Sequence, residues 1–440
     1  MVETFESALE LLNARWSESN IDPTLDRIID LMDHLGSPQE TFPVIHLAGT
    51  NGKTSTSRMI DSLLIALGVR TGRYTSPHLE SINERITFSG ELITNERFLD
   101  TYNDIALYLD LIDSRHTHRL SYFEVLTAMA FVAFADAPID AGVIECGLGG
   151  EWDATNVVDS SVAVITPIGI DHVAYLGNSL AGIARTKSKI IKPGSVAVLA
   201  AQPIEAAAEI MRRAAEVEAM PLRCGVEFGV VERNIAVGGQ LLTIEGLGGR
   251  YEDIFLPLHG AHQAENAALA LVAVESIIGE ANQTLNTDAI KSGFATATSP
   301  GRLEIVRRSP TVLLDVAHNP HGAVALVDSL ESAFTFDYIV AVVGMFADKD
   351  ARTFLELLEP VVNELVLTQT NSPRALPESD LFEIALEIFG ENRVHRSGSD
   401  IKEAILTGLE LADAPGRALL ITGSVTTVGQ ARTFLKERKS

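Results

Sequence analysis

The segment from residue 43 to residue 68 constrains the fold most, because it reads as a strand, a glycine loop and a helix in direct succession. The apolar run PVIHLA (43–48) is typical of a short buried strand and leads into the loop GTNGKT. The apolar residues of TSRMIDSLLIALG follow helical spacing, and Gly68 predicts the helix end. A phosphate-binding loop needs this succession, because glycine N–H groups and a helix N-terminus together favour anions.

The loop departs from the general phosphate-loop pattern G-x-x-x-x-G-K-[ST], since Leu47 stands where the pattern has its first glycine. In a phosphate loop, Lys53 would neutralise the β and γ phosphates and Thr54 would face a metal ion. The alternative is an ordinary strand-to-helix turn. The expected phosphate-binding residues are Gly49, Thr50, Asn51, Gly52, Lys53 and Thr54.

Strand-like and helix-like runs alternate through the first two thirds of the chain. Continuous apolar runs predict parallel strands covered on both faces at AGVIECG (141–147), VAVITPIG (162–169) and SVAVLAA (195–201). Residues 226–258 predict a small β-hairpin elaboration, followed by a helix in AHQAENAALALVAVESII. We therefore expect an N-terminal P-loop ATPase-like α/β domain with a mainly parallel sheet over residues 1–298.

A Pro-Gly break in ATATSPGRLEIV predicts a domain boundary near residue 299. Beyond it the alternation restarts in TVLLDVAHN, DYIVAVVGMF, ELVLTQT and ALLITGSV, each followed by a helix-like run. This predicts a C-terminal Rossmann-like α/β domain over residues 299–440.

Polar residues follow several predicted strands, at the edge where open α/β sheets bind ligands. Glu145 ends one strand before a glycine-rich turn, and Asp171 and His172 follow the next. A carboxylate near a phosphate loop is a natural Mg²⁺ ligand. The alternatives are a turn-capping carboxylate and a hydrogen-bonded turn histidine.

Three further polar segments allow two interpretations each. YTSPHLESINERI (74–86) is either a functional loop or a solvated one. Lys187, Lys189 and Lys192 precede a strand, and their spacing does not distinguish one lysine from a basic helix end. Asp315 and His318 follow the first strand expected in the second domain, beside an inter-domain cleft, although Asp315 or Asn319 would also serve as a helix cap.

Composition limits the partners of the chain. Its 34 Lys and Arg against 59 Asp and Glu give a formal net charge of −25, which argues against nucleic-acid binding through a broad basic surface. No apolar run approaches the roughly 18 residues of a membrane helix, and the acidic N-terminus does not resemble a signal peptide. Two cysteines give no disulfide framework, so we expect a cytoplasmic protein without a membrane partner.

In this order, the segments resemble the folylpolyglutamate synthases, including the bifunctional bacterial form with dihydrofolate synthase activity, within the Mur ligase superfamily of ATP-dependent amide ligases. The resemblance runs from about residue 5 to about residue 435. The segments that carry it are HLAGTNGKTST, YTSPHLESINERI, IECGLGG.WDATN, IGIDH, IARTKSKIIKPG, AHQAENAALA, PGRLE, LDVAHNPHG and ITGSV.

The resemblance implies a set of cofactor-binding residues. The phosphate loop of the family looks like G-T-N-G-K-[ST], so Leu47 is regular here. Lys53 and Thr54 are expected to contact the ATP phosphates. The expected magnesium ligands are Thr54, Ser76, Glu145, His172 and Lys187, the last as N6-carboxylysine. Carbamylation would turn the cationic amine of Lys187 into an anionic oxygen donor for Mg²⁺.

The resemblance also implies residues outside the metal site. Those expected to hold the nucleotide or bridge the domains are Asn266, Arg302, Asp315 and His318, and the incoming glutamate is expected near His318 and Ser424. TKSK stands where the family often has Glu-Lys-Ala-Gly, and Glu151 and Trp152 stand where Arg and Leu are common. Trp152 either stacks in the pterin pocket or packs in the core.

The activity implied is ligation of L-glutamate to dihydropteroate or to a reduced folate. ATP would phosphorylate the acceptor carboxylate, glutamate would attack the acyl phosphate, and Lys53, Lys187 and His318 would act in catalysis. We expect a monomer. The alternatives are another Mur-type amino-acid ligase acting on a cell-wall precursor, and an ATP-binding homologue without catalysis.

Overall fold

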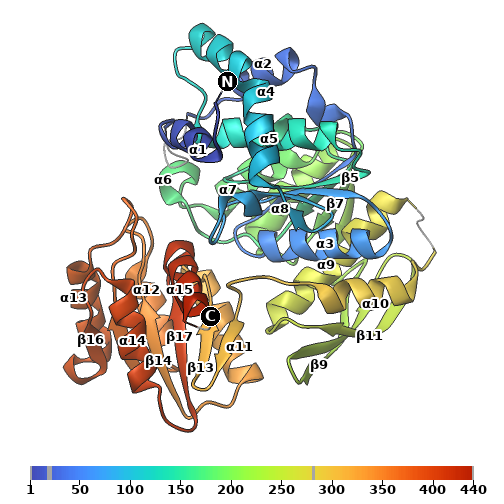
Figure 1. The fold of residues 1–440 in the computed structure, drawn as a ribbon. Coiled ribbons are helices and arrows are strands. Elements are labelled where there is room, and N and C mark those ends of the chain that lie inside the picture. Colours follow the sequence, from blue (N-terminus) through green and yellow to red (C-terminus); the bar gives the residue numbers. More distant parts are fainter. Residues whose placement is uncertain (1, 17–21, 280–282, 439–440) are drawn as a thin grey trace.

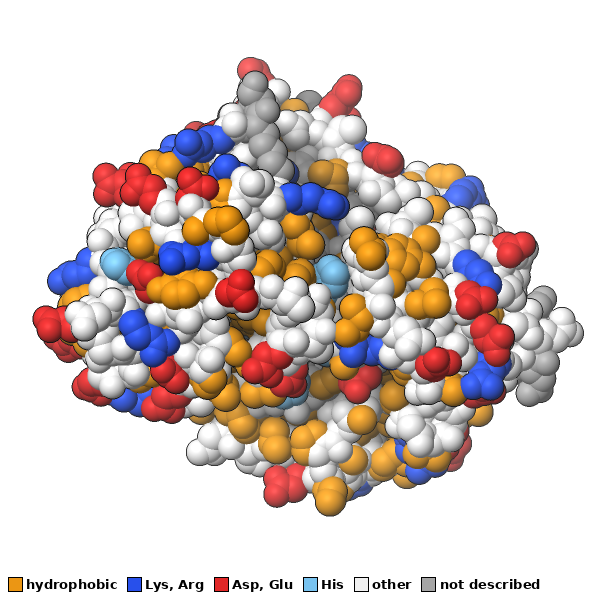
Figure 2. Space-filling view, turned by 90° about the horizontal axis from the view of Figure 1, so that it is seen from below, with side chains coloured by type: hydrophobic (Ala, Val, Ile, Leu, Met, Phe, Trp, Pro, Cys, Tyr) orange, Lys and Arg blue, Asp and Glu red, His pale blue; other side chains and the backbone are white. Residues whose placement is uncertain are grey.

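The structure is a computed structural model that describes residues 2–16, 22–279 and 283–438. It contains an eight-stranded sheet, a three-stranded sheet packed beneath it and a six-stranded sheet formed by the C-terminal part of the chain (Figure 1). Among the described helices, none combines the length and the apolar character that a bilayer crossing requires. On the face shown in Figure 2, basic side chains are interspersed with acidic and apolar ones.

The eight-stranded sheet has the order β4-β3-β2-β5-β1-β6-β7-β8, and β2, β5, β1, β6, β7 and β8 run parallel. Its strands are β1 (Val44–Ala48), β2 (Thr71–Tyr74), β3 (Ile86–Phe88), β4 (Glu91–Leu92), β5 (Ala141–Glu145), β6 (Val162–Ile165), β7 (Val196–Leu199) and β8 (Met220–Arg223). The predicted buried parallel strands are confirmed, and every residue of β1, β5 and β6 is buried.

Helices cover both faces of this sheet, because alternate residues of a strand point to opposite faces. Ile45 and Leu47 of β1 pack on the side of α3 (Lys53–Ala66), α9 (Ala261–Ile278) and α10 (Thr287–Thr296). Val44 and Ala48 point to the opposite side. That side is covered by α1 (Phe5–Asn13), α2 (Asp26–His34), α4 (Asn95–Arg115), α5 (Tyr122–Asp136), α7 (Leu180–Lys187) and α8 (Ile204–Glu216).

The predicted hairpin elaboration is larger than a single hairpin. It is an antiparallel sheet of three strands, β9 (Gly229–Ala236), β10 (Gly239–Glu245) and β11 (Arg250–Leu256). Glu275 of α9 accepts hydrogen bonds from Leu247 N (2.7 Å), Gly248 N (3.0 Å) and the Tyr251 hydroxyl (2.9 Å). One buried carboxylate thus fastens this sheet to α9.

The six-stranded sheet has the order β12-β13-β17-β14-β15-β16, with β12 antiparallel and the other strands parallel. Its strands are β12 (Glu304–Arg308), β13 (Thr311–Leu314), β14 (Tyr338–Val343), β15 (Glu364–Leu367), β16 (Val394–Arg396) and β17 (Arg417–Thr422). One face carries α11 (Pro320–Ala333), α12 (Ala351–Leu358) and α13 (Glu378–Phe389), and the other carries α14 (Ile401–Leu411) and α15 (Val425–Glu437).

The predicted Rossmann-like alternation is confirmed here with two corrections. The strand at residues 311–314 is the second of this sheet, because β12 precedes it and pairs with it antiparallel. β16 and α14 also lie between the predicted elements. β16 has only three residues, of which Val394 alone is buried, so its apolar signal is too short to predict a strand.

The parallel order brings the carboxyl ends of β2, β5, β1 and β6 to one edge of the first sheet. The segment after β13 approaches this edge from the second sheet, since Asn319 forms hydrogen bonds with Asn51. Polar segments from both sheets therefore meet at one place, which positions the candidate site.

Candidate functional site

The loop after β1 follows a path that glycine alone tolerates at two positions. Gly49 has φ +153°, and a Cβ atom there would lie 1.8 Å from Thr166 Oγ1. Gly52 has φ +90°, and a Cβ atom there would lie 2.7 Å from Asn266 Oδ1. The loop backbone is thus held closely between the segment after β6 and helix α9, with α3 beginning at Lys53.

Polar contacts hold the loop in this shape. Lys53 Nζ donates to Gly49 O (3.0 Å) and Thr50 O (3.3 Å), so the ammonium group lies over the loop. Thr50 Oγ1 donates to Gly169 O and accepts from Gly169 N, both at 3.0 Å. A cation, a glycine-rich backbone and a helix N-terminus converge here, which is the arrangement that binds phosphate groups.

Glu145 lies at the end of β5, beside the start of α3. Its side chain is buried, and its two carboxylate oxygens accept hydrogen bonds from the hydroxyls of Thr54 (2.8 Å) and Thr75. Thr75 follows β2 and precedes Ser76, which is also buried. These hydroxyl and carboxylate oxygens are hard donors of the kind that Mg²⁺ prefers.

Lys187 and His172 belong to a second group, which lines a small pocket with Gly49, Lys53 and Asp171. Lys187 Nζ donates to Gly49 O at 2.7 Å. Burial, together with the charge of Lys53, lowers the pKa of Lys187 to about 7. Burial also lowers the pKa of His172 to about 3, with Lys349 contributing, so its imidazole is neutral near pH 7.

The residues predicted to hold magnesium therefore lie in two neighbouring groups. Thr54 and Glu145 do not line the pocket that contains His172 and Lys187. Within the part of the chain that the structure describes, no three His, Cys, Asp or Glu side chains are grouped so as to hold a metal ion. A complete site from these groups needs further oxygen donors, and the assignment of the ligands stays a prediction.

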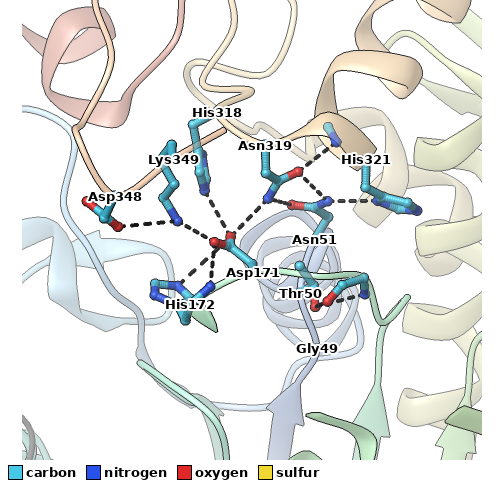
Figure 3. A network of polar contacts seen from close by, with 12 residues as sticks. Gly49, Thr50, Asn51, Asp171, His172, His318, Asn319, His321, Asp348 and Lys349 are labelled. Atoms are coloured by element: carbon cyan, nitrogen blue, oxygen red, sulfur yellow. Dashed lines mark hydrogen bonds and ion pairs between the residues drawn. The ribbon is translucent and has the colours of Figure 1, made fainter. Parts of the chain in front are cut away.

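Asp171 connects the two sheets (Figure 3). Its carboxylate accepts hydrogen bonds from Asn319 Nδ2 (3.0 Å) and Lys349 Nζ, and it lies 3.5 Å from His318 Nε2. Burial opposes its ionisation, yet the His318 hydrogen bond and the Lys349 charge hold the pKa of Asp171 well below its usual value. The carboxylate is therefore ionised and contacts three residues of the C-terminal part.

Asn51 in the phosphate loop makes a second connection. Its side-chain amide donates to Asn319 Oδ1 (3.2 Å) and accepts from Asn319 Nδ2 (3.3 Å), and its Nδ2 lies 2.8 Å from His321 Nδ1. Asn319 also caps helix α11, because Oδ1 accepts from Gly322 N at 2.8 Å. The helix-cap interpretation is correct for Asn319, and the same side chain contacts the phosphate loop.

Asp315 has a different structural role from Asn319. It accepts from Leu303 N (2.9 Å) and Ala317 N (2.8 Å), so it joins the segment before β12 to the segment after β13 rather than capping α11. Burial raises its pKa, although the nearby charge of Arg302 opposes this shift. Burial lowers the pKa of Arg302, and Asp315 opposes that shift in turn.

The remaining predicted residues lie around the same edge. Asn266 is buried on α9, against Gly52, and donates to Gln263 Oε1 at 3.2 Å. Ser424 is buried at the end of β17, where it accepts from Thr427 N (3.0 Å) as the N-cap of α15. Their contacts with nucleotide and glutamate stay predictions.

Three features of the site differ from the sequence interpretation. Thr75, which was not singled out, is the residue next to Ser76 that bonds Glu145. Lys349 was also missed, although it follows β14 in the polar run ADKD, the same strand-end signal that pointed to Asp171. Trp152 is 38% exposed, so the core interpretation of this side chain is wrong.

The fold and site define a phosphate-loop protein of two α/β parts, and family comparisons assign it to a class. The model of the Mur ligase middle domain matches residues 47–274. The model of the Mur ligase glutamate ligase domain matches residues 301–425.

Relatives narrow this assignment. The dihydrofolate synthase/folylpolyglutamate synthase of Mycobacterium tuberculosis is 49% identical over 96% of this chain and 92% of its own. The protein of the same name from Bacillus subtilis is 33% identical over 99% of this chain and 100% of its own. The chain therefore belongs to the dihydrofolate synthase/folylpolyglutamate synthase family of Mur ligases.

Solved structures agree with this family. The M. tuberculosis folylpolyglutamate synthase complexed with ADP matches with a TM-score of 0.94 at 48% identity, covering 98% of both chains. E. coli FolC in complex with DHPP and ADP matches with a TM-score of 0.87 at 31% identity, covering 100% of this chain and 99% of its own. These names favour the folate interpretation over the cell-wall one.

Proposed function

We propose that this chain is an ATP-dependent ligase that joins L-glutamate to dihydropteroate, to the γ-carboxylate of a folate, or to both, and releases ADP and phosphate. The observation that carries the proposal is the meeting of the phosphate loop with the C-terminal part, through Asn51 and Asn319. This contact places a nucleotide-binding loop beside the second sheet, as a ligase needs when it activates one substrate and delivers another. The relatives named above support both acceptor substrates.

The chemistry requires an activated acceptor, because a free carboxylate is a poor acyl donor. The acceptor carboxylate attacks the terminal phosphoryl group of ATP and becomes an acyl phosphate. The amine of glutamate then attacks the acyl carbon, and inorganic phosphate leaves. The chain contributes positioning and charge stabilisation, in which Lys53 and the loop N–H groups of residues 49–52 offset the negative charge of the transferring phosphoryl group.

The residues around Glu145 fit Mg²⁺ by their chemistry. The side-chain oxygens of Thr54 and Glu145 lie 2.8 Å apart at the start of α3. Ser76 follows Thr75 in the chain, and the Thr75 hydroxyl also bonds Glu145. We assign Thr54, Ser76 and Glu145 to one metal ion, and His172 with Lys187 to another. Bound Mg²⁺ would neutralise phosphate charge. The neutral imidazole of His172 is the form that binds metal ions.

Lys187 fits a metal site only in a modified form, because an ammonium group repels cations. A pKa of about 7 leaves a large share of its amine neutral at physiological pH. The neutral amine is the form that adds carbon dioxide and becomes N6-carboxylysine. The burial that lowers this pKa therefore favours the carbamate at Lys187 and gives the group an anionic oxygen donor.

The remaining predicted residues are assigned to the binding of the nucleotide and of the amino acid. We assign Asn266, Arg302 and Asp315 to ATP binding, since Asn266 adjoins Gly52. We assign His318 and Ser424 to the incoming glutamate, because both follow strands whose carboxyl ends lie side by side in the second sheet. His318 would orient the attacking amine or the acyl phosphate.

The proposed enzyme has two domains, residues 1–298 and 299–440. Residues 297–303, which connect α10 with β12, support this boundary. We propose that it acts as a monomer, and in the cytoplasm, where ATP and glutamate are available to it.

The deciding experiment is an activity panel with product masses. Purified chain is incubated with ATP, Mg²⁺ and glutamate, together with dihydropteroate, tetrahydrofolate or a UDP-muramoyl acceptor. We expect glutamate-dependent ADP release and a product one glutamyl residue heavier with at least one folate-type acceptor. Turnover with the UDP-muramoyl acceptor alone, or ATP binding without amino-acid-dependent turnover, would refute the proposal.

A further inference from the structure

The loop between β2 and β3, residues 75–85, reaches across to the C-terminal part of the chain. Its first residue, Thr75, donates a hydrogen bond to the Glu145 carboxylate in the site, and Ser76 follows it in the chain. Leu79, near the middle of the loop, packs against the apolar core beneath α15, a cluster that includes Val316 and Val428. This segment of the first sheet therefore rests on the second.

Glu80 extends this contact by charge. Its carboxylate accepts from three residues of α15: Arg432 Nη1, Thr433 Oγ1 at 3.2 Å and Lys436 Nζ at 2.6 Å. Despite the burial of the carboxylate, Lys436 and Arg432 hold the pKa of Glu80 below its usual value. The loop thus carries near its midpoint an ionised carboxylate that binds three residues of α15.

Arg432 binds a second carboxylate at the same time. Its Nε and Nη2 donate to Glu304 of β12 at 3.0 Å in a forked arrangement. Glu304 in turn accepts from Gly301 N at 2.8 Å, within the segment that connects the two sheets. One guanidinium therefore ties together the loop, the connecting segment and the last helix.

The backbones of the loop and α15 also approach closely. A Cβ atom at Gly429 would lie 2.0 Å from Leu79 O, so the helix presents bare backbone to the loop at this point. Gly429 lies one helical turn before Arg432 and Thr433, on the side that faces Glu80. The contact between loop 75–85 and α15 therefore combines apolar packing, close backbone approach and ion pairs.

The two ion pairs of Glu80, with Arg432 and with Lys436, differ in how far they are buried. The Arg432 and Glu80 side chains are each 18% exposed, whereas Lys436 is 57% exposed. Exposed pairs contribute little because water and salt screen them, whereas the Arg432 guanidinium is less exposed and is fixed by its forked contact with Glu304. Arg432 rather than Lys436 is therefore the residue that holds Glu80.

We infer that Glu80 and Arg432 are positioning residues for the ligation reaction: α15, through Arg432, holds loop 75–85 in the place where Thr75 bonds Glu145. The inference rests on the proposed function for its effect on turnover. The C-terminal part would then have a second role besides binding the amino acid. The position of α15 would determine the position of residues 75–85, which belong to the first sheet. Neither residue is among those assigned above to the nucleotide, the metal ions or the glutamate.

Steady-state kinetics of Glu80→Gln, Arg432→Met and the double variant test this inference. Each single change should lower kcat about tenfold and leave the KM for ATP within about twofold. The double variant should lose little more than Arg432→Met alone, because that change already removes the Arg432 partner of Glu80. Arg432→Lys should recover part of kcat, and the control Lys436→Met should stay within about twofold of the unchanged chain. Unchanged kcat in both single variants, or losses that multiply in the double one, would overturn the inference.

Hydrogen exchange of the full chain without substrates provides a readout that does not depend on activity. Amides of residues 75–85 should exchange about tenfold faster in Glu80→Gln and Arg432→Met, and not in Lys436→Met. Equal exchange in all chains, or a rise spread over the whole molecule, would contradict local positioning. If the unchanged chain ligates glutamate to no acceptor, the proposed function fails, and this exchange result alone decides the positioning role.

Discussion

Lys53 has one of the simplest roles at the scale of single residues, because its ammonium group lies over the phosphate loop, where it donates to Gly49 O and Thr50 O. We predict that Lys53→Met lowers ligation by about 10³-fold, since it removes a cation from the transferring phosphoryl group. The thermal midpoint should change by less than about 3 °C. Coupled ADP-release assays and thermal unfolding measure the two effects.

Lys291→Met is the control for this prediction. The Lys291 side chain is 37% exposed and lies 3.8 Å from Asp253, on a helix far from the loop in the chain, so its removal should leave ligation unchanged. Full activity in Lys53→Met would exclude Lys53 from the mechanism.

His46 should make folding sensitive to acid. It is fully buried in β1, where its Nε2 lies 2.8 Å from Thr155 Oγ1 and 3.2 Å from Cys146 Sγ. Burial, with a contribution from Lys192, lowers the pKa of His46 from 6.5 to about 3. The stability that depends on its neutral form is therefore complete above pH 6.5 and is lost as the pH falls toward 3, because the unfolded chain binds the proton first.

We predict that His46→Gln removes a slope of up to about 1.4 kcal/mol per pH unit from the acid side of the stability curve. Urea unfolding between pH 7 and 4 measures this, as the difference in slope between the two chains. Parallel curves for the two chains would show that His46 does not couple folding to protons.

At the scale of elements, the phosphate loop depends on the close approach of α9. We predict that Gly52→Ala weakens ATP binding at least about tenfold. The new Cβ atom would lie 2.7 Å from Asn266 Oδ1 and would displace either the phosphate loop or helix α9. Calorimetric titration with ATP measures the loss.

Gly68→Ala is the matched control. Gly68 has φ +84°, similar to Gly52, but a Cβ atom there meets nothing within 4 Å. The substitution should cost about 1–2 kcal/mol of stability through backbone strain alone and leave ATP binding unchanged. Equal ATP affinity in both variants would contradict the steric argument.

Elements were predictable where apolar periodicity was long and local. The strand before the phosphate loop and helix α9 lie where the sequence predicts them. The predicted run 162–169 yields a strand of only Val162–Ile165, because Thr166 packs under Gly49 and the next residues turn into the site. Hydropathy does not distinguish a buried strand residue from a buried residue of a site loop.

At the scale of the whole molecule, Asp171 and Lys349 hold the two sheets together. We predict that Lys349→Met lowers the free energy of unfolding by about 1–3 kcal/mol, because the buried carboxylate loses an ionised partner. Asp171→Asn should then cost less in the Lys349→Met chain than in the unchanged one. Urea unfolding of the unchanged chain, the two single variants and the double variant measures the coupling. Strictly additive losses of unfolding free energy would show that the Asp171–Lys349 pair does not contribute to stability.

The candidate site was predictable as residue types at strand ends, but not as contacts. Lys53, Glu145 and His172 lie at carboxyl ends of β1, β5 and β6, which local sequence signals indicate. Thr75 and Lys349 were missed, because a threonine beside a turn and a lysine after a strand occur at many positions without function. Their importance depends on the partners they meet, Glu145 and Asp171.

The sequence by itself determined the strand–loop–helix unit, the two α/β parts and the chemistry available at their strand ends, because these depend on neighbours a few residues apart. Only the tertiary structure decided which of these groups meet. Asn51 and Asn319 are 268 positions apart, Asp171 and Lys349 are 178 apart, and Glu80 and Arg432 are 352 apart. Such contacts arise from how helices and sheets pack against one another, and no local pattern of residues encodes that packing.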